Sequence, residues 1–290
     1  MALGFGAATA NKMRCRPVFV ASIGCGRIAR FERHILGATL MNVRAAEAVR
    51  NRSDVSRFLV HLTRNNKAEY PRTGGTARET FEAIMREKKI RAKGIHCLHG
   101  RQLKLQPLEI SRQCRVVCLT ETPLDEIKHL TEVYRAIDLE NYGFVFPKSF
   151  LLAKDAQPAI YVNGYCLGSA QRKRFDKILQ VAIDGKFKGT IWRTLPFVNV
   201  MHDGHDFAWE REWRVGATID FRLSDLVCVI LPEDEEDLRE QMTKNGIAAI
   251  DPNWSHERMV EELSRQQRRT RQIWLPKVMK VKPKLKLRRA

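Results

Sequence analysis

The sequence lacks several features that would assign it to a familiar class. No stretch approaches the ~20 consecutive apolar residues of a membrane-spanning helix, so we expect no membrane partner. Its seven cysteines include no C-x-x-C pair, and their odd number argues against a disulfide framework. This cysteine usage predicts a reducing, cytoplasmic environment. No G-x-x-x-x-G-K-[ST] run is present, which excludes a P-loop.

A zinc site is equally poorly supported by the sequence. Cys114 and Cys118 lie near His96 and His99 in the chain, and these residue types are zinc ligands. Their spacing fits the usual structural zinc sites poorly, and burial as small apolar side chains explains the cysteines better. We therefore expect no metal.

Acidic residues are scarce, and the C-terminal end has none. The chain has 51 Lys and Arg against 33 Asp and Glu, a net charge of +18, and Arg265 to Ala290 holds eleven basic residues and no acidic one. Such a tail binds polyanions through counterion release, or simply stays solvated and aids solubility. The first alternative makes nucleic acid a partner and predicts these nucleic-acid-binding residues: Lys277, Lys280, Lys282, Lys284, Lys286, Arg288 and Arg289.

The remaining pattern is that of a globular α+β protein. At 290 residues and 44% hydrophobic content, the chain can bury one large core. Several short strand patterns are interrupted by helical ones, as in α+β folds. We expect a basic arm over residues 1–50, one domain over 51–232, a helical segment over 233–274 and the basic tail over 275–290.

Individual elements are predicted from periodicity and capping residues. Thr76 with Glu79 forms a capping box that starts a helix ending near Ile90, and Thr122 before Pro123 is a second expected helix cap. Further helices are expected from Ser169, over 233–242 and over 255–274. Strand patterns end at Arg64 and cover 113–119, 142–146, 159–162, 190–195, 212–217 and 225–231, and a short ordered segment is expected over 247–250.

Three polar pairs, each with a spacing of two, lie on or beside these strands. They are His61 with Thr63, Thr120 with Thr122, and Glu210 with Glu212. Successive side chains on a strand alternate between faces, so each pair can present both members on one face. In the first pair, His61 and Thr63 are expected to share a face with Leu59, and the other face carries Phe58, Val60 and Leu62. By this rule Arg214 joins the two glutamates on their face, and the expected opposite face carries Trp209, Trp213 and Val215.

Each pair also has a purely structural interpretation. His61 and Thr63 can be a half-buried, hydrogen-bonded pair, and Thr120 with Thr122 can be only a turn and a helix cap. Glu210 and Glu212 can be ion partners of neighbouring arginines on an exposed strand, since surface charge pairs are common. Spacing alone leaves both interpretations open.

Taken together, the pairs resemble the ADP-ribosyltransferase pattern over roughly Arg57 to Leu231. That family holds NAD+ with a His or Arg on the first strand, a Ser/Thr/Tyr motif on the second and a Glu on a late strand. The resemblance implies an ADP-ribosyltransferase-like split β-sheet core with flanking helices, and NAD as a substrate. It also implies that Thr120-Glu121-Thr122 braces the active-site Glu, and that Glu212 is that catalytic residue.

The resemblance assigns roles to the other residues as well. His61 would bond a ribose of NAD+, Thr63 would lie near the nicotinamide amide, and Glu210 would be directed at the acceptor. Nicotinamide needs an aromatic stacking partner, for which Tyr134, Tyr142 and Trp192 are the candidates. The first strand reads His-Leu-Thr-Arg rather than the family's usual motif, and Arg64 could replace His61 only if a bulge brought it to the same side.

A second resemblance comes from an ordered series of segments. "CLTETPL", "NYGFVFPKSFL", "QPAIYV" and "EREWRV" occur in an order similar to the AbiGi-like abortive-infection proteins, which belong to phage-defence and toxin–antitoxin loci. Together the two resemblances imply an NAD-dependent ADP-ribosyltransferase toxin that modifies a macromolecule, with a possible cognate antitoxin. The basic tail favours RNA or DNA as the acceptor, with protein next. A non-catalytic nucleic-acid-binding antitoxin and an NAD glycohydrolase are the alternatives.

Overall fold

The computed structural model describes residues 55–65, 75–132, 138–164, 169–201 and 208–269. The chain divides into two units, Met1–Asn51 and Arg52–Ala290, and all described residues belong to the second. The expected arm over 1–50, Tyr134 and the seven basic residues of the tail lie outside the described residues.

The strands are short, and most belong to one sheet. Their bounds are β1 (Phe58–Asn65), β2 (Lys89–Ile90), β3 (Val117–Thr120), β4 (Asp138–Pro147), β5 (Gln157–Pro158), β6 (Ile160–Asn163), β7 (Val198–Met201), β8 (Glu212–Val215), β9 (Ile219–Asp220), β10 (Cys228–Ile230) and β11 (Ala249–Ile250). Seven of them form a sheet in the order β11-β10-β4-β1-β3-β8-β5, and β2–β9 and β6–β7 form two smaller pairs.

Helices interrupt these strands throughout, which confirms the α+β prediction. The α-helices are α2 (Ala77–Glu87), α3 (Gly100–Lys104), α4 (Leu108–Gln113), α5 (Lys128–Glu132), α6 (Lys148–Leu152), α7 (Ala170–Asp184), α8 (Glu236–Lys244) and α9 (His256–Arg269). The 3₁₀ helices are η1 (Leu124–Glu126), η2 (Ile191–Phe197), η3 (Ala208–Glu210) and η4 (Leu223–Asp225). Among the described helices, none is both long and apolar enough to cross a membrane.

Capping residues start two of the longer helices as the sequence predicts. Thr76 accepts a hydrogen bond from the Glu79 amide at 3.1 Å, and the Glu79 carboxylate accepts one from the Thr76 amide at 2.7 Å. Ser169 likewise accepts from the Arg172 amide at the start of α7. These caps satisfy amide groups that the first helical turn leaves without a partner.

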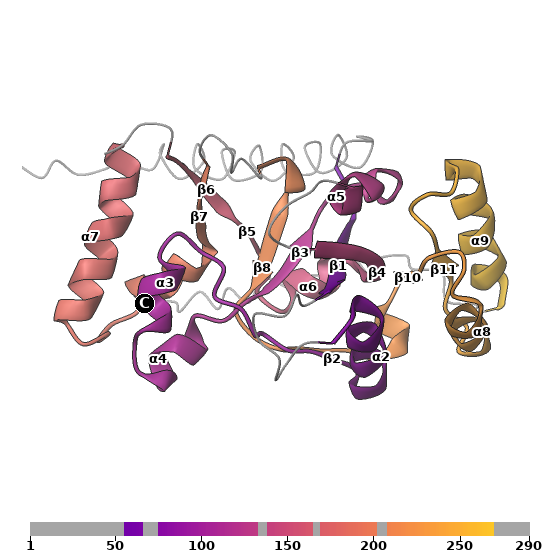
Figure 1. Ribbon diagram of the computed structural model, residues 1–290, viewed down its shortest axis with the longest axis horizontal. Coiled ribbons are helices and arrows are strands. Elements are labelled where there is room, and N and C mark those ends of the chain that lie inside the picture. Colours follow the sequence, from indigo (N-terminus) through magenta and orange to yellow (C-terminus); the bar gives the residue numbers. More distant parts are fainter. Residues whose placement is uncertain (1–54, 66–74, 133–137, 165–168, 202–207, 270–290) are drawn as a thin grey trace, which may run out of the picture. The chain divides into compact units, whose positions relative to one another are not determined.

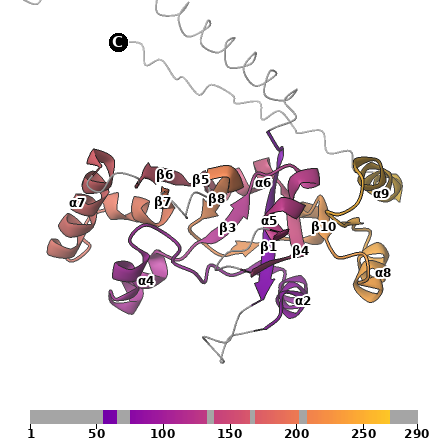
Figure 2. The ribbon, with the colours of Figure 1, turned by 45° about the horizontal axis from the view of Figure 1, so that its top comes forward.

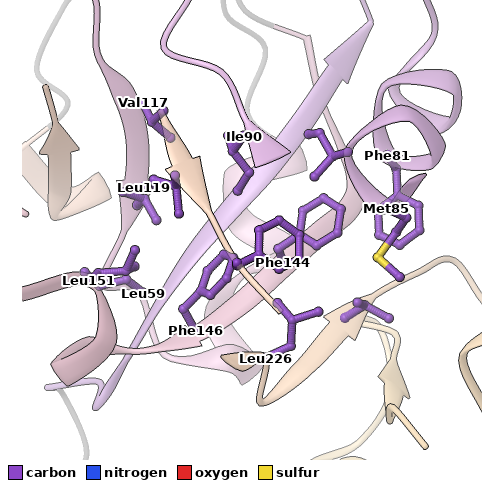
Figure 3. Close-up of a cluster of buried hydrophobic side chains, with 14 of the residues drawn as sticks. Leu59, Phe81, Met85, Ile90, Val117, Leu119, Phe144, Phe146, Leu151 and Leu226 are labelled. Atoms are coloured by element: carbon purple, nitrogen blue, oxygen red, sulfur yellow. The ribbon is translucent and has the colours of Figure 1, made fainter. Parts of the chain in front are cut away.

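One face of the large sheet carries an aromatic core (Figure 3). Phe144 stacks on Phe81 of α2 with ring centroids 4.7 Å apart, and Phe146 meets Phe221 edge-on at 5.3 Å. Helices α2, α6 and α8 contribute to this cluster. The opposite face packs Val60, Val145 and Ile230 against α5 and α9. The sheet is therefore buried on both sides around β4, β1 and β10.

A third core lies apart from these two, in a group of helices that we call the helical lobe (residues 95–115 and 169–197). Leu103 of α3, Leu179 of α7, and Trp192 and Leu195 of η2 are buried together there. Figures 1 and 2 both show α3, α4 and α7 at the end of this unit opposite α8 and α9.

Two local predictions are wrong. Residues 191–197 form the 3₁₀ helix η2 instead of a strand, with Pro196 inside it, because Trp192 turns inward and its indole donates to the Phe187 and Gly189 carbonyls. Thr122 does not cap a helix; η1 follows Pro123 without a side-chain cap, because the Thr122 hydroxyl is bonded to Thr120 instead.

Candidate functional site

Three strands that the sequence singles out are neighbours in the sheet, in the order β1-β3-β8. Strand β1 meets β3 at the Val60–Thr120 pair, and Thr120 lies directly opposite Glu212 of β8. Both pairings are antiparallel. Because neighbouring strands lie about 4.8 Å apart, the backbones of His61, Thr120 and Glu212 lie in one part of the sheet although these residues are far apart in sequence. Directly paired residues share a face, so Thr120 and Glu212 lie on the face of Val60, and His61 lies on the opposite face with Leu59.

Glu212 is held by a buried arginine two residues later on the same strand face. Arg214 donates from Nε to Oε1 at 2.9 Å and from Nη2 to Oε2 at 2.8 Å, while its Nη1 donates to the Pro196 carbonyl at 2.6 Å. The Tyr161 hydroxyl also donates to Oε2, at 3.1 Å. The Arg214 side chain is completely shielded and that of Glu212 is 11% exposed. This pair is a buried, bidentate salt bridge rather than an exposed one.

The charges of this cluster shift the titration of its members. Burial opposes the charge on Arg214, but the neighbouring Glu212 carboxylate outweighs it and raises the pKa of the guanidinium. Burial, followed by the charge of Glu212, raises the pKa of the Tyr161 hydroxyl and of the Cys118 thiol. Both groups therefore stay protonated at neutral pH and can act as hydrogen-bond donors to the carboxylate.

Thr120 and Thr122 brace the backbone just before Glu212. The Thr120 hydroxyl donates to the Glu210 carbonyl and accepts the Thr122 amide at 3.0 Å. The two hydroxyl oxygens are 2.7 Å apart. Because the Thr120 hydroxyl donates its proton to the Glu210 carbonyl, it accepts a hydrogen bond from the Thr122 hydroxyl. These bonds fix the chain as it enters β8.

Glu210 does not share a strand face with Glu212, which corrects the sequence prediction. It ends the 3₁₀ helix η3, and the strand begins only at Glu212. Arg211 between them has φ 46°, the left-handed region that non-glycine residues rarely adopt. This turn breaks the alternation from which a shared face was expected. The charge of Glu210 nevertheless contributes to raising the pKa of the Tyr161 hydroxyl.

Glu121, the middle residue of the Thr-Glu-Thr motif, faces the other side of the sheet. Its carboxylate accepts the Trp213 indole N–H at 2.8 Å and pairs with Lys148 of α6. The Lys148 ammonium also lies over the Trp213 ring, 4.5 Å from its centroid. These contacts anchor β3 and β8 from the face opposite Glu212.

The members of the His61 pair have separate partners. His61 donates from Nδ1 to the Cys118 carbonyl at 2.9 Å, which ties β1 to β3 beyond their ladder pair. Burial is the main cause that lowers the pKa of His61, and the charge of Arg64 adds to it. Thr63 instead donates to the Ala77 carbonyl at 2.9 Å and to the Tyr142 carbonyl at 3.2 Å, and so holds the start of α2.

A register shift lies between Leu62 and Arg64, but its extra residues are on β4 and not on β1, where a bulge would be needed to bring Arg64 to the side of His61. Leu62 pairs with Gly143, and Arg64 pairs with Leu139. Leu59 belongs to one core, and Val60 and Leu62 to the other, so the facing predicted for β1 is confirmed up to Leu62. The positive charge of Arg64 acts to lower the pKa of both His61 and Cys118, although burial outweighs it at Cys118.

His96 and Cys97 also lie in this region. The sequence pattern indicates His96 only as a poorly spaced zinc ligand and does not indicate Cys97 as a site residue. Burial is the main cause that lowers the pKa of His96 to about 4, with contributions from Arg64 and Arg214. Burial also raises the pKa of Cys97, which senses Arg214 and Glu212. The His96 ring covers Gly94, where a Cβ would meet its Nε2 at 2.0 Å. Only glycine leaves room for the ring there.

No metal centre is formed by the described residues, since no three His, Cys, Asp or Glu side chains converge there. Comparisons with protein-family models, with curated proteins and with solved structures found no match for this chain. The arrangement of the site itself therefore carries any functional argument.

Proposed function

We propose that the chain is an NAD-dependent ADP-ribosyltransferase with an ADP-ribosyltransferase-like sheet, and that it modifies a macromolecule, with nucleic acid as the acceptor. Its role would be that of a phage-defence toxin with a cognate antitoxin, as the segment resemblance implies. The observation that carries the proposal is the β1-β3-β8 order, with Thr120 opposite Glu212. This order places the three polar positions expected to hold NAD+ on neighbouring strands, with Thr120 and Glu212 on one face of the sheet and His61 on the other.

The chemistry would centre on Glu212. Breaking the nicotinamide–ribose bond builds positive charge on the ribose, and a fixed carboxylate in a water-poor site stabilises that charge. A carboxylate has about four acceptor positions. Arg214 occupies two and the Tyr161 hydroxyl a third. About one acceptor position is therefore left for a ribose hydroxyl.

The three hydrogen bonds that Glu212 already accepts from Arg214 and Tyr161 also favour a second candidate, a non-catalytic nucleic-acid-binding protein. In that case the Arg214–Glu212 pair would only join β8 to η2 through the Pro196 carbonyl. Replacing Glu212 would then change stability without removing any NAD+ turnover. The two candidates therefore differ in what one conservative substitution does.

The test uses full-length protein, NAD+ labelled in its adenylate half, and separate pools of RNA, DNA and protein. Glu235→Gln is the matched control for Glu212→Gln, because Glu235 is also 11% exposed and also has an arginine and a tyrosine partner, Arg78 and Tyr142. Activity is expressed per folded protein, measured by circular dichroism.

We expect label in a nucleic-acid pool with wild type and with Glu235→Gln, and none with Glu212→Gln. Nicotinamide release without label in any pool would indicate an NAD glycohydrolase. If folded wild type neither transfers label nor releases nicotinamide, the transferase proposal is wrong and the binding protein is favoured.

A further inference from the structure

The helical lobe is strongly basic within the described chain. Its two segments contain eleven Lys and Arg against three acidic residues, Glu109, Asp176 and Asp184, a net charge of +8. The segment 233–244 at the α8 end holds six acidic residues and two basic ones. Figures 1 and 2 show these two regions at opposite ends of the unit. Charge is thus separated along this unit.

Most of the lobe's cations face solvent. Nine are exposed: Arg101, Lys104, Arg112, Lys173, Arg174, Lys177, Lys186, Lys188 and Arg193. Within the described residues, none of the nine forms an ion pair with a carboxylate. Elsewhere cations are paired, as in Arg78 with Glu235, Arg258 with Glu233, and Lys244 with Glu240. A surface of exposed cations without carboxylate partners produces the local positive potential that attracts polyanions.

A pocket opens on this lobe. It has a volume of about 530 Å³ and is lined by Arg101 and Gln102 of α3, Arg172 of α7 and Asn199 of β7, among others. Two guanidinium and two amide side chains are donors suited to phosphate oxygens. Asp176 is the acidic residue of α7 closest in sequence to Arg172, and it is engaged by His99 at 2.9 Å.

The pocket adjoins the Glu212 cluster through two connections. Asn199 is the register partner of Tyr161, whose hydroxyl donates to Glu212. Cys97 also lines the pocket, and the charges of Arg214 and Glu212 both contribute to the pKa of its thiol. The β6–β7 pair therefore connects the pocket to the side chain that bonds the proposed catalytic carboxylate.

We propose that the helical lobe binds the sugar-phosphate backbone of a nucleic acid, with one phosphate in the pocket between Arg101 and Arg172. The lobe would thereby present the acceptor to Glu212; only this last step rests on the proposed transferase function. RNA and DNA share the phosphodiester chemistry, so both are tested.

Lipid is the less suitable polyanion for this surface. A helix that lies in a membrane surface exposes large apolar and aromatic side chains beside its cations. The lobe exposes apolar side chains at Leu105, Leu108, Val181, Ile183 and Ile191, but none of its aromatic side chains is exposed, and α7 packs Phe175, Ile178 and Leu179 into the lobe core. The cations are also spread over α3, α4, α7 and the segment after α7. Such a distribution suits an extended nucleic-acid backbone, which contacts many cations along its length.

The experiment measures binding by fluorescence anisotropy, without NAD+, on the full-length chain with labelled RNA and DNA oligonucleotides. The lobe variant carries Lys173→Gln, Arg174→Gln and Lys177→Gln. The control carries Arg86→Gln, Lys93→Gln and Lys244→Gln, three exposed cations outside the lobe. Both remove the same net charge. A second pair carries the same changes in a chain whose seven basic tail residues are replaced by Gln, which removes any binding by the tail.

We expect the lobe variant to bind one or both nucleic acids about a hundredfold more weakly near 0.1 M salt, because each lost phosphate contact lowers the salt slope by about 0.7 for single strands. The control should bind like wild type. Equal losses in both variants, or no loss in the lobe variant, would overturn the proposal. So would binding of the lobe to anionic phosphatidylserine vesicles in place of either oligonucleotide. Since NAD+ is absent, failure here leaves the transferase test independent.

Discussion

The completely buried Arg214 side chain donates hydrogen bonds from Nε and Nη2 to the two carboxylate oxygens of Glu212, and from Nη1 to the Pro196 carbonyl. One guanidinium thus links β8 to η2 and neutralises the residue on which the proposed chemistry depends. Burying either charge alone is costly, so the pair has to be treated as a unit.

Removing one partner of this pair should be strongly destabilising. Arg214→Met leaves the Glu212 carboxylate buried without its counterion, and we expect a loss of about 3–5 kcal/mol in the free energy of unfolding. The double variant Arg214→Met with Glu212→Gln should recover part of that loss, because neither charge is then left alone. Urea unfolding followed by circular dichroism measures both. A double variant whose loss equals the sum of the two single losses would contradict the coupling.

Thr120 should matter for both folding and NAD+ turnover. Thr120→Val removes the donor to the Glu210 carbonyl and the acceptor of the Thr122 amide, which we expect to cost about 1–3 kcal/mol. Because these bonds fix the segment entering β8, nicotinamide release per folded protein should fall as well. Thr120→Ser keeps the hydroxyl and should retain both properties. If serine and valine behave alike, the hydroxyl has no bracing role.

The polar pairs could be found from the sequence because they depend on local rules. Alternation along a strand placed Leu59, Val60 and Leu62 on their correct faces, and residue type alone identified the caps at Thr76 and Ser169. Neither needs knowledge of distant parts of the chain.

The partners within the site could not be found in this way because they are set by tertiary contacts. The left-handed turn at Arg211 separates Glu210 from the strand. The Trp-Glu-Arg-Glu-Trp sequence contains no glycine or proline that would predict this turn. Tyr161 and Pro196 reach the Glu212–Arg214 pair from elsewhere in the chain. The same limit applies to Trp192, whose burial converted an expected strand into η2.

His96 should make the protein less stable in mild acid. In the native state its pKa is lowered to about 4 by burial, whereas a histidine in an unfolded chain has a pKa of about 6.5. Between these values the unfolded state binds more protons, so the free energy of unfolding falls as the pH drops through this window. The contribution is up to about 3 kcal/mol. Urea unfolding near pH 7 and near pH 5 should show a smaller pH effect in His96→Gln. An unchanged effect would contradict this role, and His256→Gln, at an exposed side chain, serves as the control.

The four described cysteines should react slowly in the folded protein. Burial raises the pKa of Cys114 to about 11, and it also raises the pKa of Cys97, Cys118 and Cys228. A thiol of pKa 11 is only roughly 0.03% thiolate at pH 7.5, and the thiolate is the reactive form. We expect alkylation with iodoacetamide to be at least about a hundredfold slower in buffer than in urea, as read by mass spectrometry of the peptides. Rapid native labelling of Cys228 would contradict its burial.

The pocket arginines should act through geometry as well as charge. Arg172→Lys keeps the positive charge but loses the planar fork that binds two phosphate oxygens at once. If a phosphate lies between Arg101 and Arg172, this change should weaken nucleic-acid binding by about fivefold and leave the salt slope unchanged, because the same number of counterions is released. Lys177→Arg, the reverse exchange on the exposed face of α7, should have little effect on affinity. Anisotropy titrations over a range of salt concentrations give both quantities. Wild-type affinity in Arg172→Lys would mean that the lobe attracts nucleic acid only as a diffuse positive surface, and that no phosphate is held in the pocket.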